Sequence, residues 1–254
     1  MTTTWDPAQY LRHADHRSRP FHDLVARIPT TPHHVVDLGC GPGNTTATLT
    51  ERWPHARLTG IDNSPEMIQQ AQHDHPGIEF TLGDIAGHTP DGEDLLLSNA
   101  ALQWVPDHTG LFPRWIQALP TGGTLAFQVP GNFGAPSHTL LAATKNSPRW
   151  AAQLADTTRA EVPEPHEYLH RLTALGCTVD AWETTYYQIL HGENPVLDWM
   201  LGTGLRPVLD ALTDSGDRDA FLAEYGAQLA RAYPATPDGT VLPFRRIFVI
   251  ATKN

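Results

Sequence analysis

The residues best suited to bind a ligand lie in a short glycine-rich segment. Apolar Val35 and Val36 lead through Asp37 into three glycines at alternate positions, Gly39, Gly41 and Gly43. Glycine adopts positive φ readily and lets backbone N–H groups approach a ligand closely. The segment therefore predicts a strand that ends near Asp37, a ligand-binding loop and then a helix.

A nicotinamide-dependent oxidoreductase is the competing interpretation of this loop. The dinucleotide fingerprint is G-x-G-x-x-G. Here the third glycine comes one residue earlier, and Asn44 occupies the position at which the fingerprint has glycine. Pro42 also stiffens the loop. The spacing therefore disfavours a pyrophosphate site.

An acidic residue ends the second predicted strand. Asp62 lies 19 residues beyond Gly43 (62 − 43) and is followed by Asn63, Ser64 and Pro65. A carboxylate in this place can accept hydrogen bonds from both hydroxyls of an adenosine ribose. The same residues also make a good turn and helix cap. Both roles can hold together, and the glycine loop favours a ribose site at Asp62 and Asn63.

Residues that could surround an adenine follow the third predicted strand. Asp84 could accept a hydrogen bond from the exocyclic amine, and Ile85 could pack on one face of the ring. Met67, on the helix after Asp62, could close the other face. A strand-ending turn and a core methionine are the structural alternative.

A third group of candidates follows the fourth predicted strand. Open α/β sheets bind ligands beyond the carboxyl ends of their strands. Asn99, Gln103 and Trp104 are expected in that place. Trp104 could equally be a tryptophan at the edge of the core.

These candidates require a scaffold of alternating strands and helices. Strands are predicted over residues 34–38, 57–62, 78–82, 94–99, 123–129, 178–190 and 244–251. Helices are predicted over 44–52, from Ser64 onward, and over 111–119, 138–154, 165–175 and 194–231. This alternation predicts βαβ units and a parallel sheet with helices on both faces. Residues 1–32 have helical spacing with breaks at Pro20 and Pro29, and two late strands enclose a helical insertion that resembles a lid.

Composition narrows the class of protein. The chain has 254 residues, of which 40% are hydrophobic, enough for a core without a metal or disulfide. Its 17 basic and 28 acidic residues give a net charge of −11, which opposes contact with a nucleic-acid backbone. The fourteen histidines lack ligand spacing, so no metal site is expected.

Cellular location is also suggested by composition. The two cysteines, Cys40 and Cys177, lie far apart in apolar stretches, which favours a reducing cytoplasm. No apolar run is long enough to span a membrane, and the first residues lack the pattern of a signal peptide. We therefore expect a cytoplasmic protein that does not associate with membranes.

The combined motifs resemble a known family. They are D-L-G-C-G-P-G-N at 37–44, G-I-D-N-S-P-E-M at 60–67, G-D-I at 83–85 and N-A-A-L-Q-W-V-P-D at 99–107. This order resembles class I S-adenosylmethionine-dependent methyltransferases. The chain is more narrowly similar to trans-aconitate methyltransferases through segments at 5–11, 17–21, 199–207 and 242–248.

The resemblance implies a Rossmann-like sheet of seven strands, mostly parallel, with the last strand antiparallel. We expect one methyltransferase domain over 1–254, with an N-terminal helical cover at 1–32, a cofactor-binding core at 33–130 and a helical substrate lid at 191–243. The implied cofactor is S-adenosyl-L-methionine, and the implied partner is a small-molecule carboxylate. We expect the protein to act as a monomer.

A carboxylate acceptor determines which further residues matter. It is ionised at neutral pH, so no general base and no catalytic side chain is expected. Arginine binds carboxylates in bidentate fashion, which makes Arg206, Arg245 and Arg246 candidates for the acceptor. The last two face opposite ways on a strand, so at most one should reach it. Tyr10 could add a hydroxyl, and Arg19 could meet the carboxylate of the cofactor.

Two other functions remain open from the sequence. One is methyl transfer to a phenol, an amine or a natural-product acid, for which His108 or His191 could act as the base. The other is a non-catalytic protein that binds S-adenosylmethionine or S-adenosylhomocysteine. Turnover and its pH dependence would distinguish these alternatives.

Overall fold

The computed structural model describes residues 14–157 and 162–254, which form two compact units. An α/β unit includes residues up to Pro130, together with Val162–Thr184 and Arg246–Asn254. A helical unit includes described residues within Gly131–Glu161 and Thr185–Arg245. Two long strands, β6 and β7, contribute residues to both units.

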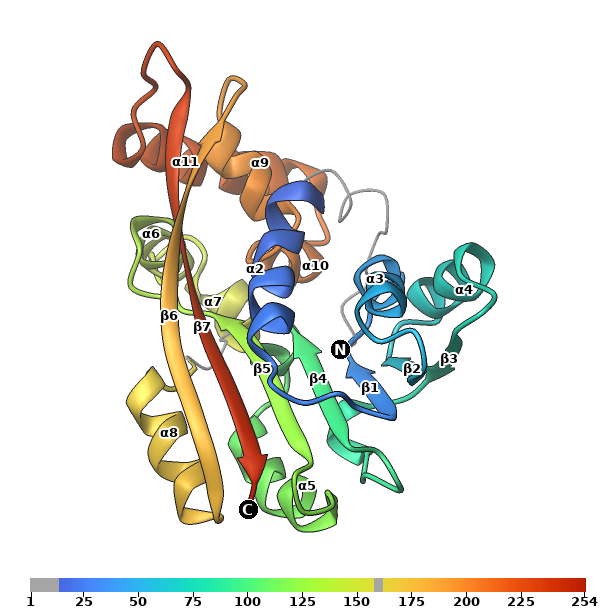
Figure 1. The fold of residues 1–254 in the computed structure, drawn as a ribbon. Coiled ribbons are helices and arrows are strands. Elements are labelled where there is room, and N and C mark those ends of the chain that lie inside the picture. The colour runs from blue at the N-terminus through green and yellow to red at the C-terminus, as the bar shows by residue number, and fades with distance from the viewer. Residues whose placement is uncertain (1–13, 158–161) are drawn as a thin grey trace. The chain divides into compact units, whose positions relative to one another are not determined.

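A seven-stranded sheet forms the scaffold (Figure 1). Its strands are β1 (His34–Leu38), β2 (Arg57–Asp62), β3 (Glu79–Leu82), β4 (Leu95–Asn99), β5 (Thr124–Pro130), β6 (Cys177–Leu190) and β7 (Thr240–Lys253). Their spatial order is β3-β2-β1-β4-β5-β7-β6. The first five pair in parallel, and β7 runs antiparallel to β5. The structure confirms the predicted Rossmann-like sheet.

The strand order changes direction beside β1, and this change positions the candidate site. β2 and β3 lie on one side of β1, whereas β4 and β5 lie on the other. Open α/β sheets bind ligands beyond the carboxyl ends of their strands at such a point. The glycine loop follows β1, and Asn99 ends β4.

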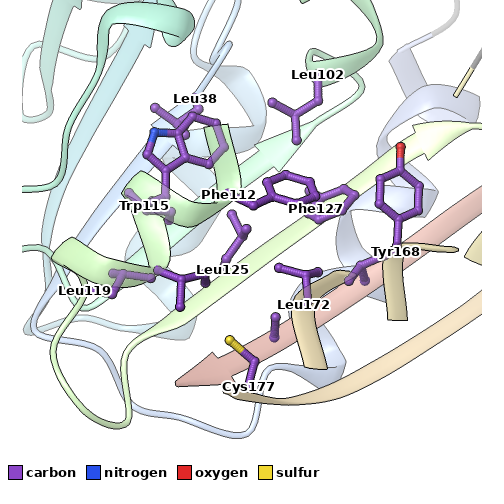
Figure 2. Close-up of a cluster of buried hydrophobic side chains, with 14 of the residues drawn as sticks. Leu38, Leu102, Phe112, Trp115, Leu119, Leu125, Phe127, Tyr168, Leu172 and Cys177 are labelled. Carbon is purple, nitrogen blue, oxygen red and sulfur yellow. The ribbon is translucent and has the colours of Figure 1, made fainter. Parts of the chain in front are cut away.

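One apolar core lies between the sheet and two helices, α5 (Phe112–Ala118) and α8 (Pro165–Ala174). Figure 2 shows Phe112 of α5 between Trp115 of the same helix on one side and Phe127 of β5 and Tyr168 of α8 on the other. The rings of Phe127 and Tyr168 meet edge to face, with centroids 5.1 Å apart. Burial of each large side chain of this kind contributes about 1.5–3 kcal/mol.

The helices α2 (Ala14–Arg27), α3 (Asn44–Arg52) and α4 (Pro65–Asp74) also belong to the α/β unit. Ser64 caps α4 as predicted, with its hydroxyl accepting a hydrogen bond from the backbone N–H of Met67 at 3.3 Å. The predicted break at Pro20 is wrong, because α2 continues through this residue.

The packing of α2 explains why Pro20 does not end it. Phe21, Leu24 and Val25 of α2, and Ile28 directly after it, recur at helical spacing and are all buried. An internal proline removes one helical hydrogen bond and costs about 3 kcal/mol. Burial of four large apolar side chains outweighs that cost.

The helical unit contains α6 (Pro136–Lys145), α7 (Ala151–Leu154), α9 (Pro195–Leu201), α10 (Arg206–Ala211) and α11 (Ser215–Ala232). The single helix predicted over 138–154 is wrong, because the chain breaks before α7 at Ser147 and Pro148. Tyr225 of α11 donates a hydrogen bond to the carbonyl of Ser137 at 2.5 Å and thereby joins α11 to α6. The role of 191–243 as a substrate lid stays a prediction.

Candidate cofactor and substrate site

The glycine loop has the backbone conformation that its sequence predicts. Gly39, Gly41 and Gly43 have φ angles of 81°, 57° and 78°, which only glycine adopts without strain. The backbone N–H of Gly39 donates to the carbonyl of Ile61 at 2.7 Å, and this bond ties the loop to β2. The first glycine of the loop is therefore held against the neighbouring strand β2.

The three glycines differ in what surrounds them. A Cβ atom on Gly39 would overlap the Cβ of Ala101, and a Cβ on Gly43 would lie 2.7 Å from the ring of Phe80. A Cβ on Gly41 would have no described atom within 4 Å. Gly39 and Gly43 are thus required by close packing, whereas no described side chain or backbone packs on Gly41 in this direction.

Asp37 is a buried carboxylate at the foot of the loop, with a relative exposure of 1%. Its Oδ2 accepts a hydrogen bond from the Thr46 hydroxyl at 2.6 Å, whereas its Oδ1 has no hydrogen-bond partner among the described residues. Burial raises the pKa of Asp37 to about 7, although the Thr46 hydrogen bond opposes the shift. A buried acceptor in this condition fits a cationic ligand group such as an ammonium.

Asp62 has both carboxylate oxygens engaged by the backbone. Oδ2 accepts from the N–H of Gly41 and Oδ1 from the N–H of Ser64, each at 2.9 Å. The predicted turn is therefore present. Each oxygen retains a second lone pair, which leaves capacity for ribose hydroxyls. Burial raises the pKa of Asp62, while these backbone hydrogen bonds lower it, and its neighbour Asn63 is exposed.

The predicted adenine-binding residues have structural roles. Asp84 caps η1 (Ile85–Gly87), because its Oδ1 accepts from the backbone N–H of Ala86 at 2.9 Å. Ile85 belongs to the core cluster, and Met67 is buried on α4. Their contact with an adenine stays a prediction.

The loop after β4 carries the next candidates. Ala100 has a φ of 55°, an unusual conformation for a residue with a Cβ atom. The backbone N–H of Ala100 donates to the carbonyl of Gln128 at 3.0 Å, which holds the turn. Gln103 is buried and donates to the carbonyl of Ala100, and Trp104 is half-buried. Gln103 and Trp104 both lie on η2 (Leu102–Trp104).

A buried polar contact links three strands of the sheet. Arg246 of β7 donates from Nη1 to Oε1 of Gln128 on β5 at 3.2 Å, and Gln128 donates in turn to Oδ1 of Asn99 on β4. Sequence reasoning missed Gln128. Its signal was a lone amide within the apolar run Leu125-Ala126-Phe127-Gln128-Val129.

The other predicted residues are distributed over the chain. Arg206 begins α10 and Arg245 donates from Nη1 to the carbonyl of Gly131 at 2.9 Å; both belong to the helical unit. Arg19 is exposed on α2. Tyr10 lies outside the described residues. Within the α/β unit, hydrogen bonds join Gly41 to Asp62 and connect Asn99 through Gln128 to Arg246.

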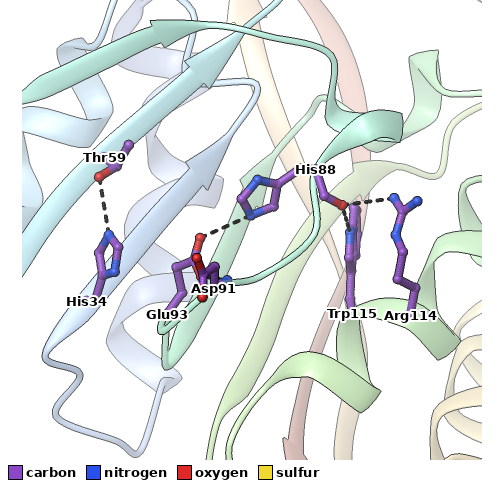
Figure 3. Close-up of polar contacts among 7 residues, drawn as sticks. All are labelled: His34, Thr59, His88, Asp91, Glu93, Arg114 and Trp115. Atoms are coloured by element: carbon purple, nitrogen blue, oxygen red, sulfur yellow. Dashed lines mark hydrogen bonds and ion pairs between the residues drawn. The ribbon is translucent and has the colours of Figure 1, made fainter.

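His108 and His88 are two histidines with polar side-chain partners. His108 is buried, and its Nε2 lies 2.7 Å from the hydroxyl of Tyr168, within the core. Figure 3 shows His88 beside Glu93, with 3.3 Å between Nε2 and Oε1, near the amino-terminal end of β4. Burial lowers the pKa of both histidines. Over residues 14–157 and 162–254, no group of three or more potential metal ligands is assembled.

None of the helices that the structure describes combines the length and apolar character needed to cross a bilayer.

Comparison with known proteins places the chain in a family. Residues 35–123 match the model of a methyltransferase domain. The chain is 55% identical to trans-aconitate 2-methyltransferase of Streptomyces avermitilis, over 99% of this chain and 97% of that protein. It is 51% identical to the enzyme of the same name from Rhodococcus jostii, over 97% and 98% of the two chains.

Solved structures agree on the fold. The YcgJ protein of Bacillus subtilis superposes with a TM-score of 0.59 at 14% identity, over 94% of this chain and 99% of that one. The plantazolicin methyltransferase BpumL, solved with S-adenosylhomocysteine, gives 0.53 at 14% identity, over 98% and 92%. The chain belongs to the trans-aconitate 2-methyltransferase family of S-adenosylmethionine-dependent methyltransferases.

Proposed function

We propose that this protein transfers a methyl group from S-adenosylmethionine to one carboxylate of trans-aconitate and releases the monomethyl ester. The observation that carries the proposal is the identity of 55% with a trans-aconitate 2-methyltransferase over almost the whole of both chains. Likeness of this extent includes the segments that lie outside the cofactor motifs.

The chemistry requires little from protein side chains. Bound S-adenosylmethionine supplies an electrophilic methyl group, whose bond to sulfur breaks with both electrons left on sulfur. The carboxylate oxygen of the acceptor provides the electron pair for the new bond, and no proton moves. Of the two histidines considered as bases, His108 is buried against Tyr168 and His191 is exposed. The role of the chain is to bind the methyl donor and the acceptor, to align them and to exclude water.

The cofactor-binding role divides among residues of the α/β unit. Asp37 would accept from the ammonium group, and Asp62 with Asn63 would accept from the ribose. Gly39, Gly41 and Gly43 would give the backbone close access, supported by the open space at Gly41. The further proposed cofactor residues are Arg19, Met67, Asp84, Ile85 and Asn99.

The acceptor-binding role is proposed from the chemistry of a tricarboxylate. Gln103 and Trp104 follow β4, and the buried guanidinium of Arg246 lies in the same α/β unit. Arg206 and Arg245 offer further guanidinium groups, and Tyr10 offers a hydroxyl. Arginine is suited to this role because its planar fork matches a carboxylate.

We propose further that the protein acts as a monomer in the cytoplasm on a small molecule rather than on nucleic acid. Its net charge of −11 supports the last point. Cys40 and Cys177 are both buried and free of disulfide bonds, which suits a reducing compartment. Sedimentation analysis tests the oligomeric state. A single domain over 1–254 with a helical lid at 191–243 is proposed as well, and unfolding in one cooperative transition would support it.

The test of function is methyl transfer from labelled S-adenosylmethionine to a panel of acceptors. The panel contains trans-aconitate, cis-aconitate, citrate, isocitrate and simple phenols. We expect selective labelling of trans-aconitate as a base-labile ester. Labelling of another acceptor, or cofactor binding without turnover, would contradict the proposed substrate.

A further inference from the structure

The contact of Arg246, Gln128 and Asn99 forms a continuous polar relay across β7, β5 and β4. Gln128 is the register partner of Asn99 in the parallel β4–β5 ladder. Arg246 pairs with Pro130, two residues beyond Gln128 on β5, so the side chains of Arg246 and Gln128 share one face of the sheet. Gln128 is 1% exposed and Arg246 is 7% exposed.

The relay has only one possible polarity. A guanidinium has donors and no acceptor, so Arg246 requires the oxygen of the Gln128 amide. The amide nitrogen of Gln128 must then face Asn99, and Asn99 must present its oxygen in return. The amide nitrogen of Asn99 is consequently turned to the other side of that side chain.

Gln128 also holds the backbone next to Asn99. The carbonyl of Gln128 accepts from the N–H of Ala100, the residue with a φ of 55°. Ala101 next packs against Gly39 of the cofactor loop. The end of β4 is thus fixed by Gln128 through both its side chain and its backbone, at the strand edge where open α/β sheets bind ligands.

We infer that Gln128 is a positioning residue, which holds Asn99 with its amide N–H groups directed at a ligand carboxylate. Arg246 sets this orientation from β7, so the guanidinium acts through Gln128 at this point of the site. The carboxylate belongs either to the methyl acceptor or to the amino-acid end of the cofactor. If the carboxylate is that of the methyl acceptor, the inference rests on the proposed function.

Replacement of Gln128 by glutamate tests the polarity. A glutamate can still accept from Arg246 but cannot donate to Asn99. The amide of Asn99 should then rotate, donate to the new carboxylate and direct its oxygen at the ligand. The amide oxygen of Asn99 would then face an oxygen of the ligand carboxylate, and the ligand should bind at least about tenfold more weakly.

Three measurements on the full chain separate the possible outcomes. The first is the side-chain amide signals of Asn99 in ¹H–¹⁵N spectra, identified with the Asn99→Asp variant. The second is the calorimetric Kd for S-adenosylhomocysteine. The third is the split between KM and kcat for the acid that the unchanged protein methylates. A rise in Kd identifies the cofactor carboxylate, and a rise in KM alone identifies the acceptor.

One variant controls for general loss of structure, and two substitutions of Arg246 test the role of its guanidinium. Ser98→Ala removes a buried hydrogen bond to the Leu38 carbonyl from the same strand and should leave the Asn99 signals, the Kd and the KM within about twofold. Arg246→Lys keeps a donor toward Gln128 and should retain more affinity than Arg246→Met.

The inference is overturned if Gln128→Glu leaves the Asn99 signals in place, or moves them without a change in either constant. It is also overturned if Ser98→Ala produces the same loss as Gln128→Glu. Failure of the unchanged protein to methylate trans-aconitate contradicts the proposed substrate instead, because the Asn99 signals and the Kd are measured without it.

Discussion

Gly39 and Ala101, in the loops that follow β1 and β4, are packed so closely that a Cβ atom on Gly39 would lie only 2.2 Å from the Ala101 Cβ. Gly41, two residues later, has no described atom near the corresponding position. Gly39 therefore allows the two loops to pack closely, whereas Gly41 has free space on its Cβ side among the described residues.

This difference predicts separate effects of two equivalent substitutions. Gly39→Ala should lower the free energy of unfolding by about 3 kcal/mol or more, because overlap with Ala101 adds to the strain of positive φ. Gly41→Ala should cost only about 1 kcal/mol from its backbone conformation but should weaken S-adenosylhomocysteine binding. Urea unfolding and calorimetry measure the two effects. Equal stability losses would contradict the assignment.

Asp62 should affect both the loop and the cofactor. Asp62→Ala removes the acceptor for the N–H groups of Gly41 and Ser64 and should lower the free energy of unfolding by about 1–2 kcal/mol. It should also weaken S-adenosylhomocysteine binding about tenfold or more, because two ribose hydroxyls lose their acceptor. The stability and the Kd of Asp62→Asn should lie between those of the unchanged protein and those of Asp62→Ala. Calorimetry with adenosine as a second ligand would locate the loss at the nucleoside, and an unchanged Kd would exclude the ribose role.

Arg206 should act on the acceptor alone. Arg206→Ala should raise the KM for trans-aconitate about tenfold or more, because a charge-assisted bidentate contact is lost, while the Kd for S-adenosylhomocysteine stays within about twofold. Arg231→Ala, an exposed arginine of α11, controls for the loss of one positive charge. Unchanged kinetics of Arg206→Ala on every carboxylate would remove Arg206 from the site.

The sequence predicted those features that depend on neighbouring residues. The helix at Asn44–Arg52 and the glycine loop follow from local spacing, because positive φ and capping are properties of a few consecutive residues. Pro20 misled the prediction, since the burial of α2 is decided by distant contacts. For Met67 and Ile85, apolar character alone cannot distinguish the core from a ligand surface.

The relay was beyond sequence reasoning for a similar cause. Asn99, Gln128 and Arg246 lie on three different strands, and their contact depends on the order and register of the sheet. The sequence indicated Arg246 and Asn99 by their chemical types. It gave no reason to connect them, because Gln128 reads as one polar residue in a buried strand.

Asp37 makes cofactor binding depend on pH. Burial raises its pKa to about 7, and the ammonium group of a bound cofactor would favour the ionised form. Binding should therefore release a proton from Asp37. Affinity for S-adenosylhomocysteine should rise by up to about tenfold per pH unit between about pH 5.5 and 7 and then level off, since the ligand amine stays charged over this range.

The stability of the ligand-free protein should change in the opposite direction. The folded-state pKa of Asp37 lies above its unfolded value of 3.8. Its contribution to stability is therefore present at low pH and is lost as the pH rises toward 7. For the binding reaction, titration calorimetry with S-adenosylhomocysteine in two buffers of different ionisation enthalpy measures the proton that Asp37 releases. Asp37→Asn, which leaves Asp62 in place, should bind more weakly and abolish the release, and a persistent release would assign the titration to another group.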